Sequence, residues 1–468
     1  MTEKEDVEAA VGGEPVAKEM KQEEPTYDAK NASETTIQQE DEEHAASSNV
    51  DEETTKQPHP RRKRRIIIAV IVVVVLLIVI TLAAVLTTDD PEQYTPDPTY
   101  LTILSEMNIT TSSSDAELEQ AMATLSDYFL STCAAGISMG VARNDTRVIV
   151  SRGVLNIDED PLRLVTQDTL FEIGSVSKPI TGLVLAHEIV TGNLTLNTTM
   201  NELLPDSVPD LIVNGEFVTL RHLVTHTSGF PRLPKNIAES SYFSFDEPNP
   251  YAGFSEEDML REISIAASDL SNGEWSYSNF AFSTLAYLIG RSRNASFPSL
   301  QNELTTRLGL NDTGIGSPAN GTSRQENLSA GYRTYGEVPY WYDGGLFIDG
   351  AGSTLSSTRD LLSLAEVFMS PEVKLKGDPD LREAVQLALE PLETVVTTPL
   401  RRNIAFGWIT GDTPPWYAHT GGTAGFSTYL NFQPETRTAI VAITNCADSD
   451  IISLADALFS KLFRIDAS

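Results

Sequence analysis

A serine and a lysine three residues apart are the residues of this 468-residue chain whose spacing first suggests chemistry. Ser175 precedes Lys178, and no other lysine of the chain has a serine three positions before it. The apolar residues that follow, as far as Gly192, recur with a helical period, so both side chains would face the same way at a helix N-terminus. A lysine can take the proton of a serine only if burial or nearby cations keep its amine neutral. The pair therefore predicts a serine nucleophile with a lysine base, although a helix N-cap beside a solvated lysine has the same pattern.

Two later segments supply further polar side chains in a fixed order. Tyr277 and Asn279 form a Tyr-x-Asn in a loop before a helical run, and His419, Thr420 and Gly421 form a His-Thr-Gly that leads into strand-like sequence. With these three motifs the chain resembles the serine β-lactamase-like superfamily, specifically its branch of class C β-lactamases, D-Ala-D-Ala carboxypeptidases and esterases. The resemblance extends from about residue 115 to the C-terminus. It includes the shorter landmarks at residues 225–229, 351–354, 357–360 and 406–408.

The resemblance implies an α+β fold of the β-lactamase/transpeptidase type, with a five-stranded antiparallel sheet flanked by helices and a second, mostly helical lobe. The order of the predicted elements agrees, because strands come first, helices follow and strands return at the end. The strands are expected at residues 136–143, 147–152, 416–419, 423–432 and 438–445. A helix is expected over about 115–129 and another over 450–463, with the site in a cleft between the lobes.

The same resemblance implies a role for each motif residue. Ser175 attacks an ester or amide carbonyl, Lys178 and Tyr277 move the proton, and Asn279 holds Lys178 or the substrate. The backbone N–H groups of Ser175 and Gly422 form the oxyanion hole. Thr420 and Gly421 contact the substrate, and no cofactor is needed. His419 stands where most β-lactamases have lysine, which favours a carboxypeptidase or an esterase over a penicillin hydrolase. The alternative is a catalytically weak membrane-tethered scaffold or sensor that keeps the fold.

Two competing motifs point elsewhere. Residues 136–140 read Gly-x-Ser-x-Gly, the nucleophile elbow of another hydrolase class, but a second strand is predicted to follow where that elbow requires a helix. His222 and His226 are four residues apart, a spacing that could bind a metal, yet no glutamate or third ligand accompanies them. We therefore predict no metal site.

The N-terminal part of the chain predicts a membrane anchor. Residues 1–65 are acidic, poor in aromatics and expected to be disordered, and end in a basic cluster at 61–65. Residues 66–86 are apolar except for one threonine. This run is long enough to cross a bilayer. The basic cluster would keep the N-terminus cytosolic, so that residues 113–468, after a stalk at 87–112, would be lumenal or extracellular. The net charge of −33 argues against binding to nucleic acid. The sequence leaves the oligomeric state open.

Sequons and cysteines agree with a secretory-pathway domain. Eight Asn-x-Ser/Thr sequons follow the apolar run, at Asn108, Asn144, Asn193, Asn197, Asn294, Asn311, Asn320 and Asn327. Only two cysteines are present, and they could be bridged or free. Because the related fold places its first strand beside its last, the resemblance implies a disulfide between Cys133 and Cys446.

Overall fold

The structure is a computed structural model that describes most of the chain after residue 97. The described residues are 98–132, 135–143, 145–238, 249–319, 322–334, 336–342, 345–397, 400–412 and 415–463. None of the helices in these ranges is long and apolar enough to cross a membrane. The expected tail, the expected span at 66–86 and the first part of the expected stalk lie outside the described residues.

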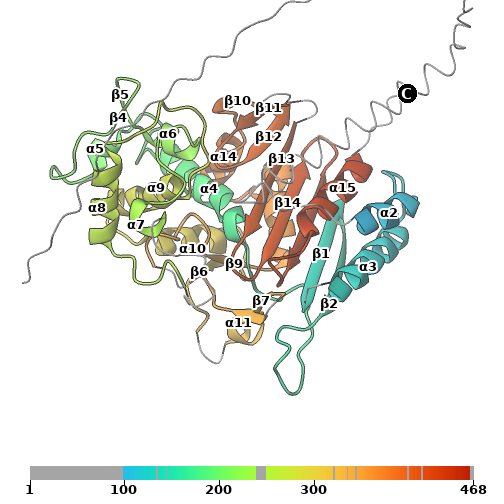
Figure 1. Ribbon diagram of the computed structural model, residues 1–468. Helices are drawn as coiled ribbons and strands as arrows, with labels where there is room; N and C mark the ends of the chain where they lie inside the picture. The colour runs from blue at the N-terminus through green and yellow to red at the C-terminus, as the bar shows by residue number, and fades with distance from the viewer. Residues whose placement is uncertain are drawn as a thin grey trace, which may run out of the picture. The chain divides into compact units, whose positions relative to one another are not determined.

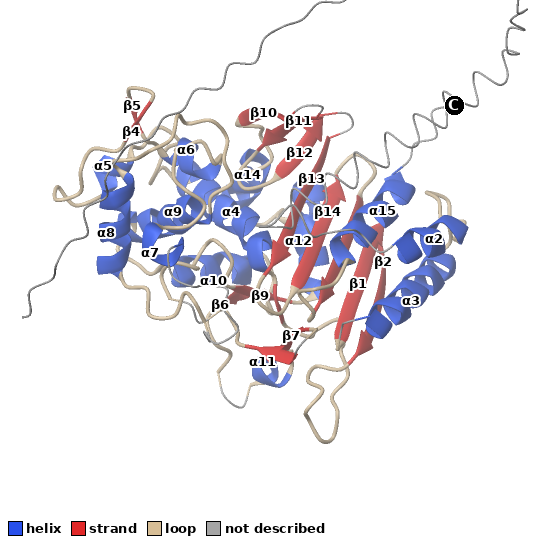
Figure 2. Cartoon of the chain, viewed as in Figure 1, coloured by secondary structure: helices blue, strands red, loops and turns tan. Residues whose placement is uncertain are grey.

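An eight-stranded antiparallel sheet forms the centre of the described domain (Figure 2), in the order β10-β11-β12-β13-β14-β15-β1-β2. Its strands are β1 (Gly136–Arg143), β2 (Thr146–Gly153), β10 (Glu393–Thr397), β11 (Leu400–Ile404), β12 (Ile409–Asp412), β13 (Pro415–Gly422), β14 (Ser427–Gln433) and β15 (Thr438–Thr444). The expectation of five strands is wrong, because β10, β11 and β12 extend the sheet beyond β13. The implied pairing of the first strand with the last is present, since β1 pairs with β15 antiparallel, with Ile137 opposite Thr444.

Both faces of the sheet are covered, so β14 and β15 are buried along their whole length. Successive side chains of a strand point to opposite faces. In β15, Ile440 and Ala442 pack with α2 (Pro98–Glu106), α3 (Asp115–Thr132) and α15 (Ile451–Phe463), whereas Val441 and Ile443 belong to the core with the remaining helices. Figure 1 shows α2, α3 and α15 together at one side of the strands, with the green and yellow helices at the other.

The segments between β2 and β10 are mostly helical, as expected. Their longer helices are α4 (Ser177–Val190), α8 (Glu256–Ala266), α9 (Asn279–Ser292), α10 (Phe297–Arg307), α12 (Thr358–Met369) and α14 (Pro379–Leu387). Their shorter helices are η1 (Gly174–Val176), α5 (Met200–Leu203), α6 (Leu220–Val224), α7 (Lys235–Ala238), α11 (Ser323–Glu326) and α13 (Pro371–Lys374). Three small sheets join β3 (Phe171–Glu172) to β9 (Thr354–Ser356) and β6 (Gly314–Ile315), β4 (Ile212–Val213) to β5 (Glu216–Phe217), and β7 (Gly331–Arg333) to β8 (Gly336–Val338).

Side-chain caps begin several of these helices. Ser278 accepts a hydrogen bond from the backbone N–H of Ala281, which starts α9 immediately after Tyr277. Buried residues lie all around α4 and α9, so both helices are held by packing on every side rather than by one apolar stripe. This burial fixes the ends of α4 and α9, where the motif residues lie.

The rival elbow motif lies within β1. Ser138 is buried there, and its hydroxyl lies 2.9 Å from that of Ser151 on β2. No strand-turn-helix follows it, because β1 leads directly into the hairpin with β2. This serine is therefore a structural residue of the sheet.

The sequons differ in exposure. Asn108, Asn193, Asn197, Asn294 and Asn311 are exposed, and Asn327 is half-buried. Asn144 and Asn320 lie outside the described residues.

Cys446, two residues after the end of β15, is fully buried and disulfide-bonded. Cys133, the other cysteine of the chain, lies outside the described residues. The pairing of the two stays a prediction.

Candidate active site

A tight turn places Ser175 at the start of α4. The chain leaves the short strand β3, reaches Gly174 at a φ of +50°, and passes through the single 3-10 turn η1 into the helix. Ser177 donates a hydrogen bond from its hydroxyl to the Gly174 carbonyl at 2.7 Å, which closes this turn. Ser175 is half-buried, whereas Lys178 is completely buried. The nucleophile therefore reaches the surface of a cleft while its partner amine lies beneath it.

The amine of Lys178 has three neighbours within hydrogen-bond distance. Its Nζ lies 3.0 Å from Ser175 Oγ and donates to Asn279 Oδ1 and to the Ala351 carbonyl, both at 2.7 Å. Burial lowers the pKa of Lys178 well below its ordinary value, and the nearby charge of Arg232 lowers it further. A neutral amine has two hydrogens and one lone pair. The two carbonyl oxygens accept hydrogen bonds from these hydrogens. The lone pair is then left to accept a hydrogen bond from the serine hydroxyl.

Aromatic side chains from two distant segments surround this amine. The ring of Tyr277 lies with its centroid 4.9 Å from Lys178 Nζ, and the ring of His419 on β13 lies 6.3 Å from that of Tyr277. His419 Nδ1 is 2.6 Å from the carbonyl oxygen of Thr420, so this nitrogen carries the ring proton and Nε2 is an acceptor. Burial, with the charge of Lys178, lowers the pKa of His419 to about 3. The imidazole is therefore neutral at physiological pH.

Two glycines let β13 approach the Ser175 turn. A Cβ atom on Gly174 would lie 2.6 Å from the Gly422 nitrogen, and one on Gly421 would lie 3.3 Å from the Ser175 nitrogen. The backbones of the turn and the strand are thus in contact next to Ser175 and Gly422, whose N–H groups the family resemblance implies as an oxyanion hole. Space beside Gly422 is open, since a Cβ atom there would meet nothing within 4 Å. A carbonyl oxygen can reach this position from the cleft.

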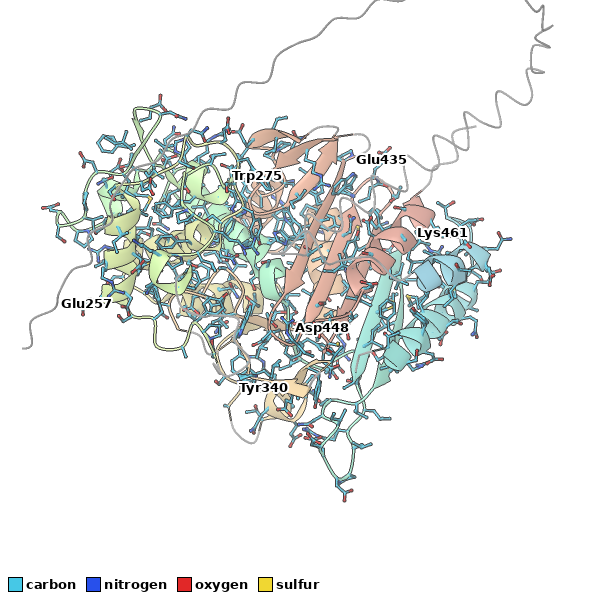
Figure 3. The ribbon with its side chains drawn as sticks, viewed as in Figure 1. Glu257, Trp275, Tyr340, Glu435, Asp448 and Lys461 are labelled. Atoms are coloured by element: carbon cyan, nitrogen blue, oxygen red, sulfur yellow. The ribbon has the colours of Figure 1, made fainter. Side chains whose placement is uncertain are left out.

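These groups line one cleft of about 510 Å³. Its wall contains all the predicted catalytic and substrate-binding side chains except the buried Lys178, namely Ser175, Tyr277, Asn279, His419 and Thr420, with the backbones of Gly421 and Gly422. Trp275 and Asp448, labelled in Figure 3 above and below the middle of the ribbon, line the same cleft. The volume suits a small-molecule substrate.

Two charged residues beside the site escaped the sequence motifs. Arg232 lines the cleft with its guanidinium 5.3 Å from the centroid of the Tyr277 ring. Glu172 is fully buried beside the turn, and its Oε1 accepts hydrogen bonds from the N–H groups of Trp341 and Tyr342. Glu172 was visible in the sequence, three residues before Ser175, but nothing in its spacing indicated a buried acid. Arg232 is not part of any sequence motif that indicates a place in the site.

The two histidines at residues 222 and 226 each accept a backbone hydrogen bond. Each Nδ1 is occupied, since His222 accepts a hydrogen bond from the N–H of Thr219 and His226 accepts one from that of Ser278, both at 3.1 Å. No group of three potential metal-ligand side chains occurs among the residues of the described ranges.

Comparisons with known proteins identify the family of this chain. A family model described as Beta-lactamase matches residues 116–460. A protein named Beta-lactamase from Pseudomonas fluorescens is 25% identical over 370 residues, covering 70% of this chain and 94% of that protein. One of the same name from Yersinia enterocolitica is 24% identical over 327 residues, covering 60% and 75%. Protein flp from Staphylococcus aureus (strain NCTC 8325 / PS 47) is 23% identical over 335 residues, covering 70% of this chain and 63% of flp.

A solved structure shares the fold. The crystal structure titled Beta-Lactamase/D-Alanine Carboxypeptidase, from Pseudomonas syringae, superimposes with a TM-score of 0.60 at 20% sequence identity. The superposition covers 76% of this chain and 100% of the other.

Proposed function

Because this chain belongs to the Beta-lactamase family, we propose that it is a serine hydrolase that cleaves an ester or an amide through an acyl-enzyme. The observation that carries the proposal is the position of Lys178 Nζ, which is fully buried and 3.0 Å from Ser175 Oγ. A buried amine without a carboxylate partner is costly to keep charged, so it is available as a base. A lysine in a helix cap would instead lie in solvent.

Acylation follows from this arrangement. Lys178 Nζ takes the hydroxyl proton while Ser175 Oγ bonds to the substrate carbonyl carbon. The negative charge that develops on the carbonyl oxygen is met by the N–H groups of Ser175 and Gly422. Asn279 Oδ1 and the Ala351 carbonyl hold the amine through its two hydrogens, so it cannot turn away from the serine. The tetrahedral intermediate then collapses and the bond from the carbonyl carbon to the leaving group breaks. The Tyr277 phenol gives its proton to the departing atom and takes the proton held by Lys178.

Deacylation needs the same groups in reverse. A water molecule attacks the acyl carbon, gives its proton to the amine or phenol, and the serine recovers its hydrogen as the acid product leaves. His419 contributes as a neutral group, because its pKa of about 3 keeps the ring uncharged. A neutral imidazole attracts a substrate carboxylate less than the lysine of most β-lactamases would. We therefore favour an esterase or peptidase over a penicillin hydrolase.

The lining of the cleft supports a substrate with an apolar part. Tyr251, Trp341 and Phe426 line it together with Ile404 and Ile409 of the two adjoining strands. Aromatic and aliphatic walls of this kind bind apolar groups, and few polar groups then fix the orientation. A small ester or a short peptide with an apolar acyl side fits this description.

We further propose that the enzyme is tethered to a membrane by residues 66–86, with residues 113–468 in the lumen or outside the cell. The support is the apolar run directly after five basic residues, together with five exposed sequons in the described domain. Treatment of the protein from a eukaryotic host with a glycosidase should lower its apparent mass. An unchanged mass would contradict this orientation.

Replacement of the nucleophile tests the hydrolase proposal. Ser175→Ala should abolish labelling by a fluorophosphonate probe and lower the turnover of a nitrophenyl ester by roughly 10³-fold or more. Ser138→Ala, which removes the buried serine of the rival motif, is the matched control and should keep both. If Ser175→Ala hydrolyses the ester as fast as the parent, the assignment of Ser175 as nucleophile fails. A parent without labelling or turnover would instead favour a tethered scaffold or sensor. If the parent is active, profiling against esters, D-amino-acid peptides and a chromogenic cephalosporin identifies its substrate class.

A further inference from the structure

His226 binds the backbone on both sides of Tyr277. Its carbonyl oxygen accepts a hydrogen bond from the N–H of Ser276 at 2.9 Å, and its Nδ1 accepts one from the N–H of Ser278 at 3.1 Å. The two donors are the residues immediately before and after Tyr277. One residue therefore holds the Trp275–Ser276 and Tyr277–Ser278 peptide groups, one before and one after the residue that carries the phenol.

The imidazole of His226 also packs on the phenol ring itself. The two ring centroids are 4.6 Å apart with an interplanar angle of 31°, and the ring of Phe282 on α9 lies 4.9 Å away from the imidazole. His226 is 5% exposed, so this contact is closed to water. The histidine thus constrains Tyr277 by its main chain and by its ring.

The backbone of His226 is held in an uncommon conformation. Its φ is +61°, in the left-handed region that non-glycine residues rarely adopt and in which asparagine and histidine are enriched. This conformation follows the end of α6 and turns the residue toward the segment of Tyr277. A residue kept in such a conformation in a buried position is a frequent sign of a functional constraint.

The imidazole must be neutral to accept a hydrogen bond at Nδ1. Burial lowers the pKa of His226 well below its ordinary value, and the charges of Lys178, His419 and Arg232 act in the same direction. The ring therefore stays an acceptor throughout the pH range in which the enzyme would work.

We propose that His226 is a positioning residue, which places the phenol of Tyr277 beside the Lys178 amine by binding the N–H groups of the residues before and after it and by stacking on its ring. This inference rests on the hydrolase function proposed above. His226 itself touches neither the serine nor the acyl group in this scheme. Its effect on the rate passes through Tyr277.

Two substitutions separate the hydrogen bond that Nδ1 of His226 accepts from the contact between its ring and that of Tyr277. His226→Asn keeps an acceptor at the place of Nδ1 and tolerates the positive φ, but it loses the ring. His226→Phe keeps a ring and loses the acceptor. We expect His226→Phe to lower kcat by roughly 10- to 100-fold with little change in KM, because a displacement of about 1 Å in a catalytic group has an effect of this size. His226→Asn should recover a large part of that loss.

His222, on the short helix α6 that ends just before His226, supplies a matched control. Its Nδ1 also accepts a backbone N–H at 3.1 Å, from Thr219, and its cap is lost in the same way in His222→Phe. The hydrogen bonds of this cap join His222 to Thr219 alone, through its ring nitrogen and its backbone N–H. We expect His222→Phe to lower the melting temperature without changing kcat.

A double-mutant cycle with Tyr277→Phe in the full-length chain tests whether His226 affects the rate through Tyr277. If His226 acts through Tyr277, His226→Phe will cause no further loss of kcat in the Tyr277→Phe background, and the two losses in melting temperature will not add. Losses in kcat that add in full would overturn the proposal. The failure of the hydrolase function looks different, because the parent and Ser138→Ala would then also lack turnover. In that case the contacts of His226 with the Tyr277 segment would have no effect on catalysis.

Discussion

A Cβ atom on Gly421 would lie only 1.9 Å from the carbonyl oxygen of Ile173. Gly421 is the third residue of the His-Thr-Gly motif, and Ile173 is two residues before the nucleophile. The absence of a side chain at Gly421 is therefore what allows β13 to lie against the Ser175 turn. The close contact between them sets the distance between the two N–H groups of the oxyanion hole.

We expect Gly421→Ala to push β13 away from the turn. Overpacking of this kind costs about 1–3 kcal/mol of unfolding free energy, and the displaced oxyanion hole should lower kcat by roughly 10²-fold. Gly422→Ala is the control for stability, because a Cβ atom there would meet nothing. Thermal unfolding and ester turnover of both variants check the prediction. Equal melting temperatures for the two would contradict it.

The pH dependence of the rate should report on Lys178. The amine is a base only when deprotonated, so kcat/KM should rise with pH through the lowered pKa of Lys178 and be high well below pH 10. The charge of Arg232 contributes to this lowering. Arg232→Gln should therefore raise the pKa of Lys178 and move the acid limb of the profile to higher pH.

Arg333→Gln is the control for that experiment. Arg333 also lines the cleft, but its guanidinium is paired with Asp448 at 3.0 Å and does not contribute to the shift at Lys178. Its profile should keep the midpoint of the parent. An acid limb that stays in place in Arg232→Gln would show that this charge does not act on the amine.

His419 should make the fold sensitive to acid. Its pKa is about 3 in the folded protein and near 6.5 when unfolded, so the unfolded chain binds the proton more tightly. The contribution of His419 to stability is complete above pH 6.5 and is lost as the pH falls toward 3. His419→Gln should flatten the fall in unfolding free energy between these values. A parallel fall in both proteins would contradict the assignment.

Glu172 should have the opposite effect. Burial raises the pKa of Glu172 from 4.5 to about 7, so the folded protein binds the proton more tightly and its contribution is lost as the pH rises through 7. Glu172→Gln keeps an acceptor for the N–H groups of Trp341 and Tyr342 without the charge. It should match the parent at pH 5 and be more stable at pH 8.5, by a difference on the order of 3 kcal/mol.

The exposed Glu435 provides the comparison for Glu172 (Figure 3), because Glu435→Gln removes the same charge from the surface. Its unfolding free energy should follow that of the parent at both pH values. If Glu172→Gln behaves like Glu435→Gln, the buried carboxyl does not titrate as described.

The local patterns predicted much of the sheet and the order of the helices. The strands expected at residues 136–143 and 147–152 are β1 and β2, which form a hairpin with Asp145 between them at a φ of +68°. Residues of one motif are close in sequence, so their spacing was enough to identify each motif. The motifs from three distant segments line one cleft, which only the resemblance to a known family had implied.

Three strands of the sheet were not predicted from the sequence. Residues 393–412 were expected to carry only the landmark at 406–408, yet they form β10, β11 and β12. Their pairing depends on β13 as a template, since β12 lies beside it. The role of His226 was also beyond the sequence, because the ring that it packs on is 51 residues later and is brought near by the packing of α6 on α9.

The pairing of β1 with β15 determines when the domain can fold. The side chain of Asn445 accepts a hydrogen bond from the N–H of Gly136, 309 positions earlier in the chain. At about 5–20 residues per second, a ribosome needs roughly 15 to 60 s to make the intervening polypeptide. During that time the N-terminal hairpin is already synthesised and presents an unpaired edge to other nascent chains. The eight-stranded sheet can therefore close only when translation of the domain is nearly finished.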